Sequence, residues 1–255
     1  MAEVPLGRAR ARRWWVSGRR VGSLDRAAAF VDDVGFAVLF PARRLVLPSL
    51  WEAVTGEDVE PFAMGMGADE QKVWAWKDEL PRRGRAWYGG FVAGRGSFLS
   101  PDLLQLLYPG AGGVDDHEML PLSQTAHAMA RALATGPLPT AELRRLVGDR
   151  SRYQRAVAEL QRHLLVTSVG VAERRSGWPA VLLALTVEAF DGGGRHDPVA
   201  AADRFVDTVL ETTPVDLSRA FRWSFPQARA CLDELTATGR ATSEGGGVVA
   251  ATRRW

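Results

Sequence analysis

The 255-residue chain is poor in cysteine, lysine and long apolar runs. Its one cysteine, Cys231, excludes an intramolecular disulfide and a cysteine-rich zinc site. No apolar run reaches the roughly 18 residues that a membrane-spanning helix needs. The first residues are basic and lack the apolar core of a secretory signal. These absences lead us to expect a cytoplasmic protein that does not enter a membrane.

Sequence motifs for cofactor and metal sites are also missing. There is no P-loop, no GxGxxG after a predicted strand and no Ser/His/Asp arrangement. The few histidines are dispersed and do not show metal-ligand spacing. They are His117, His127, His163 and His196. We therefore predict no cofactor and no metal.

Arginine dominates the positive charge. The formal net charge is only +2, but 30 of the 32 basic residues are arginine, since only Lys72 and Lys77 are lysines. Arginine makes bidentate contacts with phosphate and enters minor grooves. Because alanine and glycine are also abundant, genomic composition is an equal explanation for the total. The positions of the arginines are therefore more informative than their number.

Residues 1–22 are predicted to be a basic arm able to follow a nucleic-acid backbone. The arm carries Trp14 and Trp15, which would be unfavourable in a fully solvated tail, so we expect partial order. The alternative is a disordered tail whose tryptophan pair docks on the body. Its arginines are Arg8, Arg10, Arg12, Arg13, Arg19 and Arg20.

The remaining chain is predicted to be α+β and mainly helical, with tandem winged-helix units that carry short β-hairpin wings. Residues 23–114 are expected to form an N-terminal winged-helix-like domain. Within it, Pro81 is predicted to end a helix over 69–80, and residues 85–93 to form a helix or turn. Residues 119–190 are expected to form a second winged helix, whose last strand runs to Phe190. Residues 198–255 repeat the order of elements, either as a third winged helix or as a packing or dimer module.

The third helix of the second unit carries most of the DNA-binding prediction. Tyr153, Val157, Leu160 and Leu164 share one face of this helix. Arg152, Arg155, Glu159 and Arg162 share the opposite face, which would enter a major groove. Arg174 and Arg175 lie at the hairpin tip, where they would reach phosphates. The alternative is a solvated helix face and an ordinary polar hairpin.

Three carboxylates lie beside tryptophans and are the candidate catalytic residues. Glu52 follows Trp51, while Asp78 and Glu79 follow Trp76. A carboxylate held near an aromatic wall could orient water or stabilise an oxocarbenium-like sugar. The alternative is an exposed helix acid next to a buried tryptophan.

The N-terminal third also resembles a known family. The runs AAAFVDDVGFAVLFPARRLVLPSLWEAV, VWAWKDELP and RAWYGGF, followed by LQRHLLVTSVGVAE, are similar to the AlkZ/YcaQ family and especially to its smaller AlkZ-related members. The resemblance covers roughly residues 24–190. It implies tandem winged helices related to bacterial DNA glycosylases that unhook interstrand crosslinks and remove alkylated purines. Double-stranded DNA is the partner that it implies.

The resemblance also marks positions where this chain departs from the family pattern. In the glycosylases, two polar residues separated by an aliphatic one position the attacking water. Val38, Leu39 and Phe40 stand at these positions here, so both polar positions are apolar. Trp76 or Lys77 stands where the family has a histidine.

These observations lead to three hypotheses. The first is a DNA-binding repair or damage-protection protein without the water site, and the second is an active glycosylase with a relocated acid. The third is a winged-helix transcriptional regulator or a protein-interaction scaffold. The predicted DNA contacts are Arg12, Arg13, Arg19, Arg20, Arg43, Arg44, Arg152, Arg155, Arg162, Arg174 and Arg175.

Overall fold

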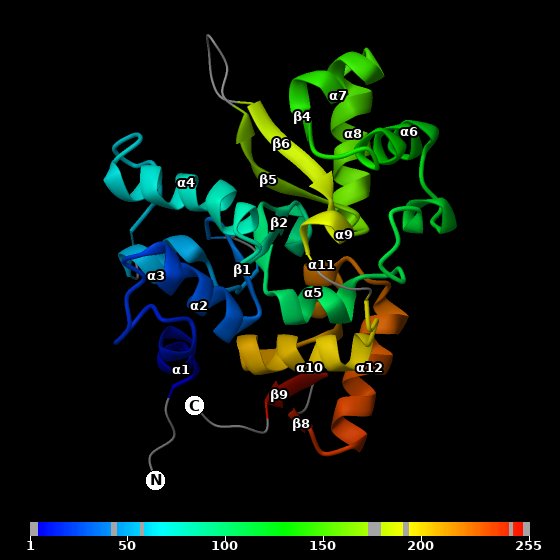
Figure 1. Ribbon diagram of the computed structural model, residues 1–255. Coiled ribbons are helices and arrows are strands. Elements are labelled where there is room, and N and C mark those ends of the chain that lie inside the picture. The colour runs from blue at the N-terminus through cyan, green and yellow to red at the C-terminus, as the bar shows by residue number, and fades with distance from the viewer. Residues whose placement is uncertain are drawn as a thin grey trace.

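The computed structural model describes residues 5–41, 45–56, 59–172, 180–190, 194–244 and 247–251. Figure 1 shows three units, with the second at the top, the first at the left and the third at the bottom. The arginines predicted to bind DNA at positions 43, 44, 174 and 175 lie outside the described residues. No helix in the described ranges combines the length and the apolar character needed to cross a membrane.

The first unit is a small three-stranded sheet covered by helices. Its elements are α2 (Leu24–Val34), β1 (Phe36–Val38), α3 (Leu50–Thr55), α4 (Ala68–Arg82), β2 (Trp87–Gly89), the 3-10 helix η1 (Val92–Gly94), β3 (Ser97–Leu99) and α5 (Pro101–Leu107). The strands are antiparallel in the order β1-β3-β2. Ser23 begins α2 by accepting a hydrogen bond from the backbone N–H of Arg26, and Gly35 follows its last residue with a φ of 79°.

Two sequence predictions in this unit are wrong. Pro81 does not end α4, because a proline in the last turn sacrifices only one backbone hydrogen bond. Instead, the helix continues to Arg82 and is terminated by Gly84, which has a φ of 63°. Its N–H donates to the Pro81 carbonyl and that of Arg85 donates to the Leu80 carbonyl, the two bonds of a Schellman motif. Residues 85–93, expected to be a helix or turn, contain β2 and only the first residues of η1.

The second unit repeats this order of elements. It comprises η2 (Asp116–Met119), α6 (Gln124–Leu133), β4 (Leu138–Pro139), α7 (Thr140–Val147), α8 (Arg150–Arg162), β5 (Val166–Ala172), β6 (Ala180–Leu185) and α9 (Thr186–Ala189). Its sheet has the order β4-β6-β5. The final strand stops at Leu185 and the chain turns into α9, so the prediction of a strand reaching Phe190 is wrong.

The third unit has the same order again. It comprises α10 (Pro198–Val209), β7 (Glu211–Thr212), α11 (Pro214–Phe221), α12 (Phe225–Ala237), β8 (Ala241–Glu244) and β9 (Val248–Ala251), with the sheet order β7-β9-β8. In all three units a helix, a strand, two helices and two strands follow one another, and the last strand lies in the middle of the sheet. This is the winged-helix arrangement, so the predicted fold class is confirmed.

The N-terminal segment is folded onto the body from residue 5 onwards and is not a separate arm. Helix α1 (Leu6–Arg13) lies against the third unit. Nε of Arg10 donates to the Val209 carbonyl at 2.8 Å, and the indole N–H of Trp14 donates to the Thr208 carbonyl at 2.7 Å. Both Trp14 and Trp15 are buried. The tryptophan pair therefore anchors this segment on the protein.

An aromatic core joins the first and third units. The ring of Phe36 in β1 stacks on Phe205 of α10, with centroids 5.3 Å apart. The edge of Phe221 from α11 meets both rings, and Phe91 lies 6.0 Å from Phe221. Apolar side chains of the second unit belong to the same cluster. Because the three units share one core, they hold one another at fixed relative positions.

Candidate nucleic-acid interface

Helix α8 presents arginine side chains to solvent. Tyr153, Ala156 and Leu160 are its buried face, whereas Arg152, Arg155 and Arg162 are exposed on the other side. The intervening acid, Glu159, accepts hydrogen bonds from the backbone N–H and the hydroxyl of Ser123 at 2.8 and 2.6 Å. Its negative charge is therefore held at the start of α6, and the outward face of α8 is basic.

A cationic pocket of about 330 Å³ lies where the C-terminal end of α8 meets the turn between α11 and α12. Its basic side chains are Arg162, His163, His196 and Arg222, and no carboxylate is among the described residues that line it. Arg222 has a φ of 58°, a left-handed conformation uncommon outside glycine. The polar residues Ser224 and Gln227 complete the wall.

The electrostatics of the cationic pocket favour an anion. Burial lowers the pKa of His163, and the neighbouring Arg162 lowers it further. Burial and Arg162 also lower the pKa of Arg222. Each shift shows that the cationic form of the group is disfavoured by its surroundings. A phosphate in the pocket would offset this repulsion and make charge-assisted hydrogen bonds with both guanidinium groups.

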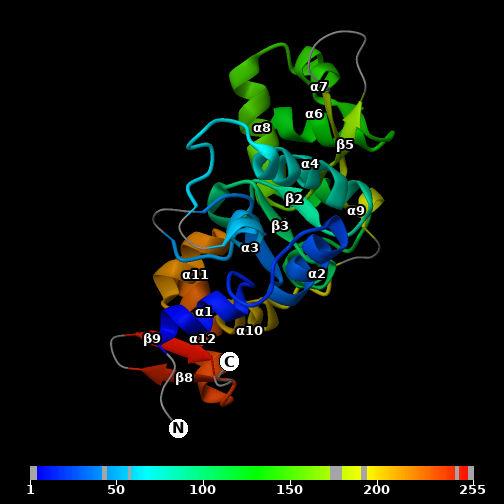
Figure 2. The same cartoon turned by 90° about the vertical axis from the view of Figure 1, so that its left-hand side faces the viewer.

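Helices α8 and α11, whose ends form the cationic pocket, lie on the same side of the molecule. Figure 2 shows both along its left-hand edge, together with the segment that joins α3 to α4. In that segment Phe62 is exposed and lies 4.9 Å from the ring of Phe40. Phe40 therefore packs against the segment that joins α3 to α4.

The family positions for the attacking water are apolar and packed. Val38 is fully buried, and its N–H donates to the Pro48 carbonyl at 2.9 Å. Phe40 lies between Phe62 and Trp51, whose ring centroid is 5.8 Å away. Neither side chain can accept a hydrogen bond from water. The chain after β1 is therefore packed among aromatic rings.

The three candidate catalytic carboxylates do not meet in one site. Ser49 is the N-cap of α3: its hydroxyl accepts from the Glu52 N–H at 3.1 Å and donates to the Glu52 carboxylate at 2.5 Å. Glu79 is bonded to Arg82 and Arg83, and these bonds, led by the one from Arg82, lower its pKa to about 2. A group with such a pKa remains ionised and is a poor general acid at neutral pH.

Asp78 differs from the other two carboxylates because it lies beside a lysine and at a contact between two units. Both of its oxygens accept from Nζ of Lys77, at 2.8 and 2.7 Å. Lys77 also lies 4.8 Å above the ring of the exposed Trp74. The hydroxyl of Ser168 in β5 is 3.5 Å from Asp78, so the carboxylate lies where the first two units meet. Burial and the Asp78 charge raise the pKa of nearby Tyr88.

The N-terminal arginines divide into exposed and buried ones. Arg12, Arg19 and Arg20 are exposed, and Arg19 stacks on Trp15 with its guanidinium carbon 5.0 Å from the ring centroid. Arg13 is buried, and it donates to the Asp33 carbonyl at 2.7 Å and to the Asp207 carboxylate at 3.2 Å. The prediction that Arg13 contacts DNA is therefore wrong, because this side chain links α2 to α10.

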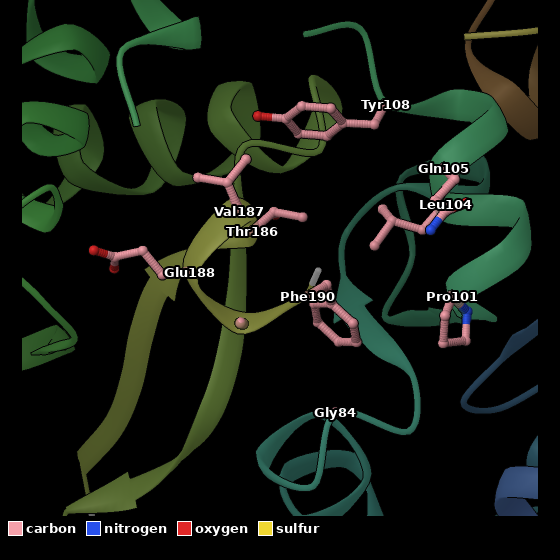
Figure 3. Close-up of a pocket in the computed structure, with 10 residues that line it drawn as sticks. Gly84, Pro101, Leu104, Gln105, Tyr108, Thr186, Val187, Glu188 and Phe190 are labelled. Atoms are coloured by element: carbon pink, nitrogen blue, oxygen red, sulfur yellow. The ribbon is translucent and has the colours of Figure 1, made fainter. Parts of the chain in front are cut away.

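A second pocket, of about 360 Å³, lies between α5 and α9. Figure 3 shows Pro101, Leu104 and Phe190 around it, with the carboxylate of Glu188 pointing away. The hydroxyl of Thr186 accepts a hydrogen bond from the buried indole N–H of Trp87 at 3.0 Å. Because no charged groups converge in this pocket, we assign it no chemistry.

Sequence reasoning did not single out His163 and Arg222, which line the cationic pocket. They lie 59 positions apart and meet only through packing of the second and third units. The only local signal for either residue is that it is basic and directly follows a helix. Within the described residues, the trio of side chains that could ligate a metal lies elsewhere, on η2 and α6.

Comparisons with known proteins agree with this architecture. Residues 21–221 match the family described as AlkZ related. The DNA glycosylase AlkZ from Streptomyces sahachiroi has a similar fold, with a TM-score of 0.60 over 97% of this chain and 69% of that chain. Sequence identity is 13%, so this likeness establishes the fold alone. No curated protein matches the sequence.

Proposed function

Because the chain belongs to the AlkZ-related family, as the sequence resemblance predicted, we propose that it binds double-stranded DNA in DNA repair or damage protection. The observation that carries the proposal is the cationic pocket at the end of α8. It places Arg162, His163 and Arg222 together without a carboxylate in its lining. The exposed arginines Arg152 and Arg155 extend the same basic face along α8.

In this proposal α8 lies in the major groove and the cationic pocket holds a backbone phosphate. Arg152 and Arg155 then face the groove from the first half of the helix. Arg162 and Arg222 come from different units, so a phosphate bound by both would register the duplex against the second and third units at once. Phosphate contacts of this kind position a protein on DNA without reading its sequence.

We further propose that the protein does not excise bases by the water-positioning chemistry of the glycosylases. Val38 and Phe40 leave no acceptor for a water at the end of β1. Glu52 and Glu79 are both engaged in local hydrogen bonds. A protein that recognises damaged DNA without cleaving it would shield or mark the lesion.

Duplex binding tests the first proposal. Fluorescence anisotropy with a labelled duplex should show affinity that falls steeply with salt, with a log–log slope of about −0.9 for each phosphate contacted. A duplex carrying a bulky alkyl or crosslink lesion should bind more tightly than the undamaged one. Preference for a particular sequence would favour a transcriptional regulator, and lack of binding would favour a protein-interaction scaffold.

A separate assay tests the absence of base excision. Alkylated duplex is incubated with the protein and abasic sites are then cleaved with alkali. We expect no strand cleavage above a heat-inactivated control. Cleavage by the wild type that is lost in Asp78→Asn and kept in Glu52→Gln would instead establish a glycosylase with a relocated acid.

A further inference from the structure

Two histidines and a glutamate come together where the segment between the first two units meets α6. His117 and Glu118 lie on η2, and His127 lies in the first half of α6. One nitrogen or oxygen from each side chain lies within 4.8 Å of those of the other two. Nε2 of His117 is 3.2 Å from Oε1 of Glu118, and Nδ1 of His127 is 3.9 Å from Oε2.

The imidazole nitrogens that face this cluster have no hydrogen-bond partner. Nε2 of His117 and Nδ1 of His127 are both buried atoms without one. Buried polar atoms are nearly always satisfied, so an unpartnered pair aimed at one carboxylate calls for an explanation. Nδ1 of His117 lies 3.0 Å from the Val114 carbonyl. A proton on Nδ1 is donated to that carbonyl and leaves the lone pair of Nε2 directed into the cluster.

We propose that His117, Glu118 and His127 bind a divalent transition-metal ion of the Zn²⁺ type, with a fourth position open to water. Two imidazole nitrogens and one carboxylate oxygen are ligands that suit Zn²⁺. Bonds of 2.0–2.2 Å around a tetrahedral ion place neighbouring ligand atoms about 3.4 Å apart. The 3.2 Å separation between His117 and Oε1 fits this value. The 3.9 Å separation of His127 is to the other oxygen, Oε2, so a shift of the exposed Glu118 side chain brings one oxygen within reach of both imidazoles.

Arg131 holds the carboxylate without occupying all of it. Its Nε and one terminal nitrogen donate to the two oxygens of Glu118 at 2.7 and 3.1 Å. A carboxylate has about four lone-pair sites, so those two bonds leave room for a metal. Arg131 is therefore a positioning residue that orients the ligand from the solvent side.

The turn before the cluster is already ordered by Asp116. Its carboxylate accepts from the hydroxyl of Tyr108 at 3.0 Å and from the backbone N–H groups of Gly112 and Gly113. A metal bound next to it would fasten this turn to α6. The ion would thereby stabilise the connection between the first and second units.

Zinc titration of the full chain tests the site. After treatment with a chelator, calorimetry and elemental analysis should show one equivalent of zinc per chain. At a hundredfold excess of zinc over Kd, Tm should rise by roughly 5–10 °C. Cobalt(II) should give the visible absorption of a four-coordinate site.

Three variants separate this site from adventitious binding. His127→Gln and Glu118→Gln each change a half-buried or exposed side chain, and each should weaken zinc binding at least about tenfold. His196→Gln alters an exposed histidine outside the cluster and should bind zinc like the wild type. Absence of stoichiometric zinc, or equal weakening in all three variants, would overturn the proposal. DNA binding by the zinc-free protein is a separate measurement and does not decide it.

Discussion

Replacing Arg162 and Arg222 with glutamine should reduce the salt dependence of duplex binding. These side chains line the cationic pocket from α8 and from the α11–α12 turn. Glutamine keeps much of the length of the side chain and its hydrogen-bonding capacity but removes the charge. If both arginines contact phosphate, the double variant releases fewer counterions when it binds DNA.

The size of the effect follows from the number of charges removed. Each phosphate contact contributes about 0.9 to the slope of log affinity against log salt, so the slope should fall by about 1.8. Between about 50 and about 200 mM salt, this difference corresponds to roughly twelvefold in affinity. The wild type should therefore lose about twelve times more affinity than the double variant over this range.

Fluorescence anisotropy at several salt concentrations measures both slopes. Arg229→Gln is the matched control, because Arg229 is exposed on α12 and forms an ion pair with Asp233 at 3.6 Å. This variant should keep the wild-type slope. Circular dichroism confirms that each variant is folded. Equal slopes for the wild type and the double variant would refute a phosphate site in the cationic pocket, and so would a control that changes as much.

Three further predictions concern stability. Arg13→Ala should lower the free energy of unfolding by roughly 1–3 kcal/mol, because it removes the hydrogen bonds that the buried guanidinium donates to the Asp33 carbonyl and the Asp207 carboxylate. In the same urea titration, Arg12→Ala should lower the free energy of unfolding by less than about 0.5 kcal/mol. Equal losses of stability in the two variants would contradict the burial of Arg13. Thr186→Val should cost about 1–3 kcal/mol by removing the acceptor for the indole of Trp87, and an unchanged urea midpoint would exclude that bond. Because the pKa of Glu79 is lowered to about 2 in the folded state, its stabilising effect is present above about pH 4.5 and lost as pH falls through 2. Glu79→Gln should therefore be less stable than the wild type at pH 7 by at most about 1 kcal/mol. This difference in stability should vanish near pH 2. A difference that stays constant with pH would contradict the prediction.

Local signals in the sequence were sufficient for most helices. Ser23 and Gly35 mark the ends of α2, and both are residue types that favour such positions. The apolar spacing of Tyr153 and Leu160 correctly places the buried face of α8. Such features depend on residues within one or two turns of each other, which is the range that periodicity and capping report.

Features that depend on distant residues were not predicted. β2 is a strand because Trp87 and Tyr88 pair with Leu99 and Phe98 of β3, and the segment itself shows no alternation. Arg12 and Arg13 are chemically identical neighbours, yet only Arg13 is buried, beside Asp207 far along the chain. The cationic pocket and the histidine cluster likewise depend on packing between separate elements.

The docking of α1 on the third unit sets an order for biosynthesis. The contacts of Arg10 and Trp14 are with residues about 200 positions later, from Thr208 to Glu211. A ribosome makes those acceptors long after α1, so α1 emerges well before its binding surface exists. During synthesis the first unit must fold with Trp14 still exposed. A nascent chain stalled before Thr208 should therefore be more prone to aggregation and to chaperone binding than the finished protein.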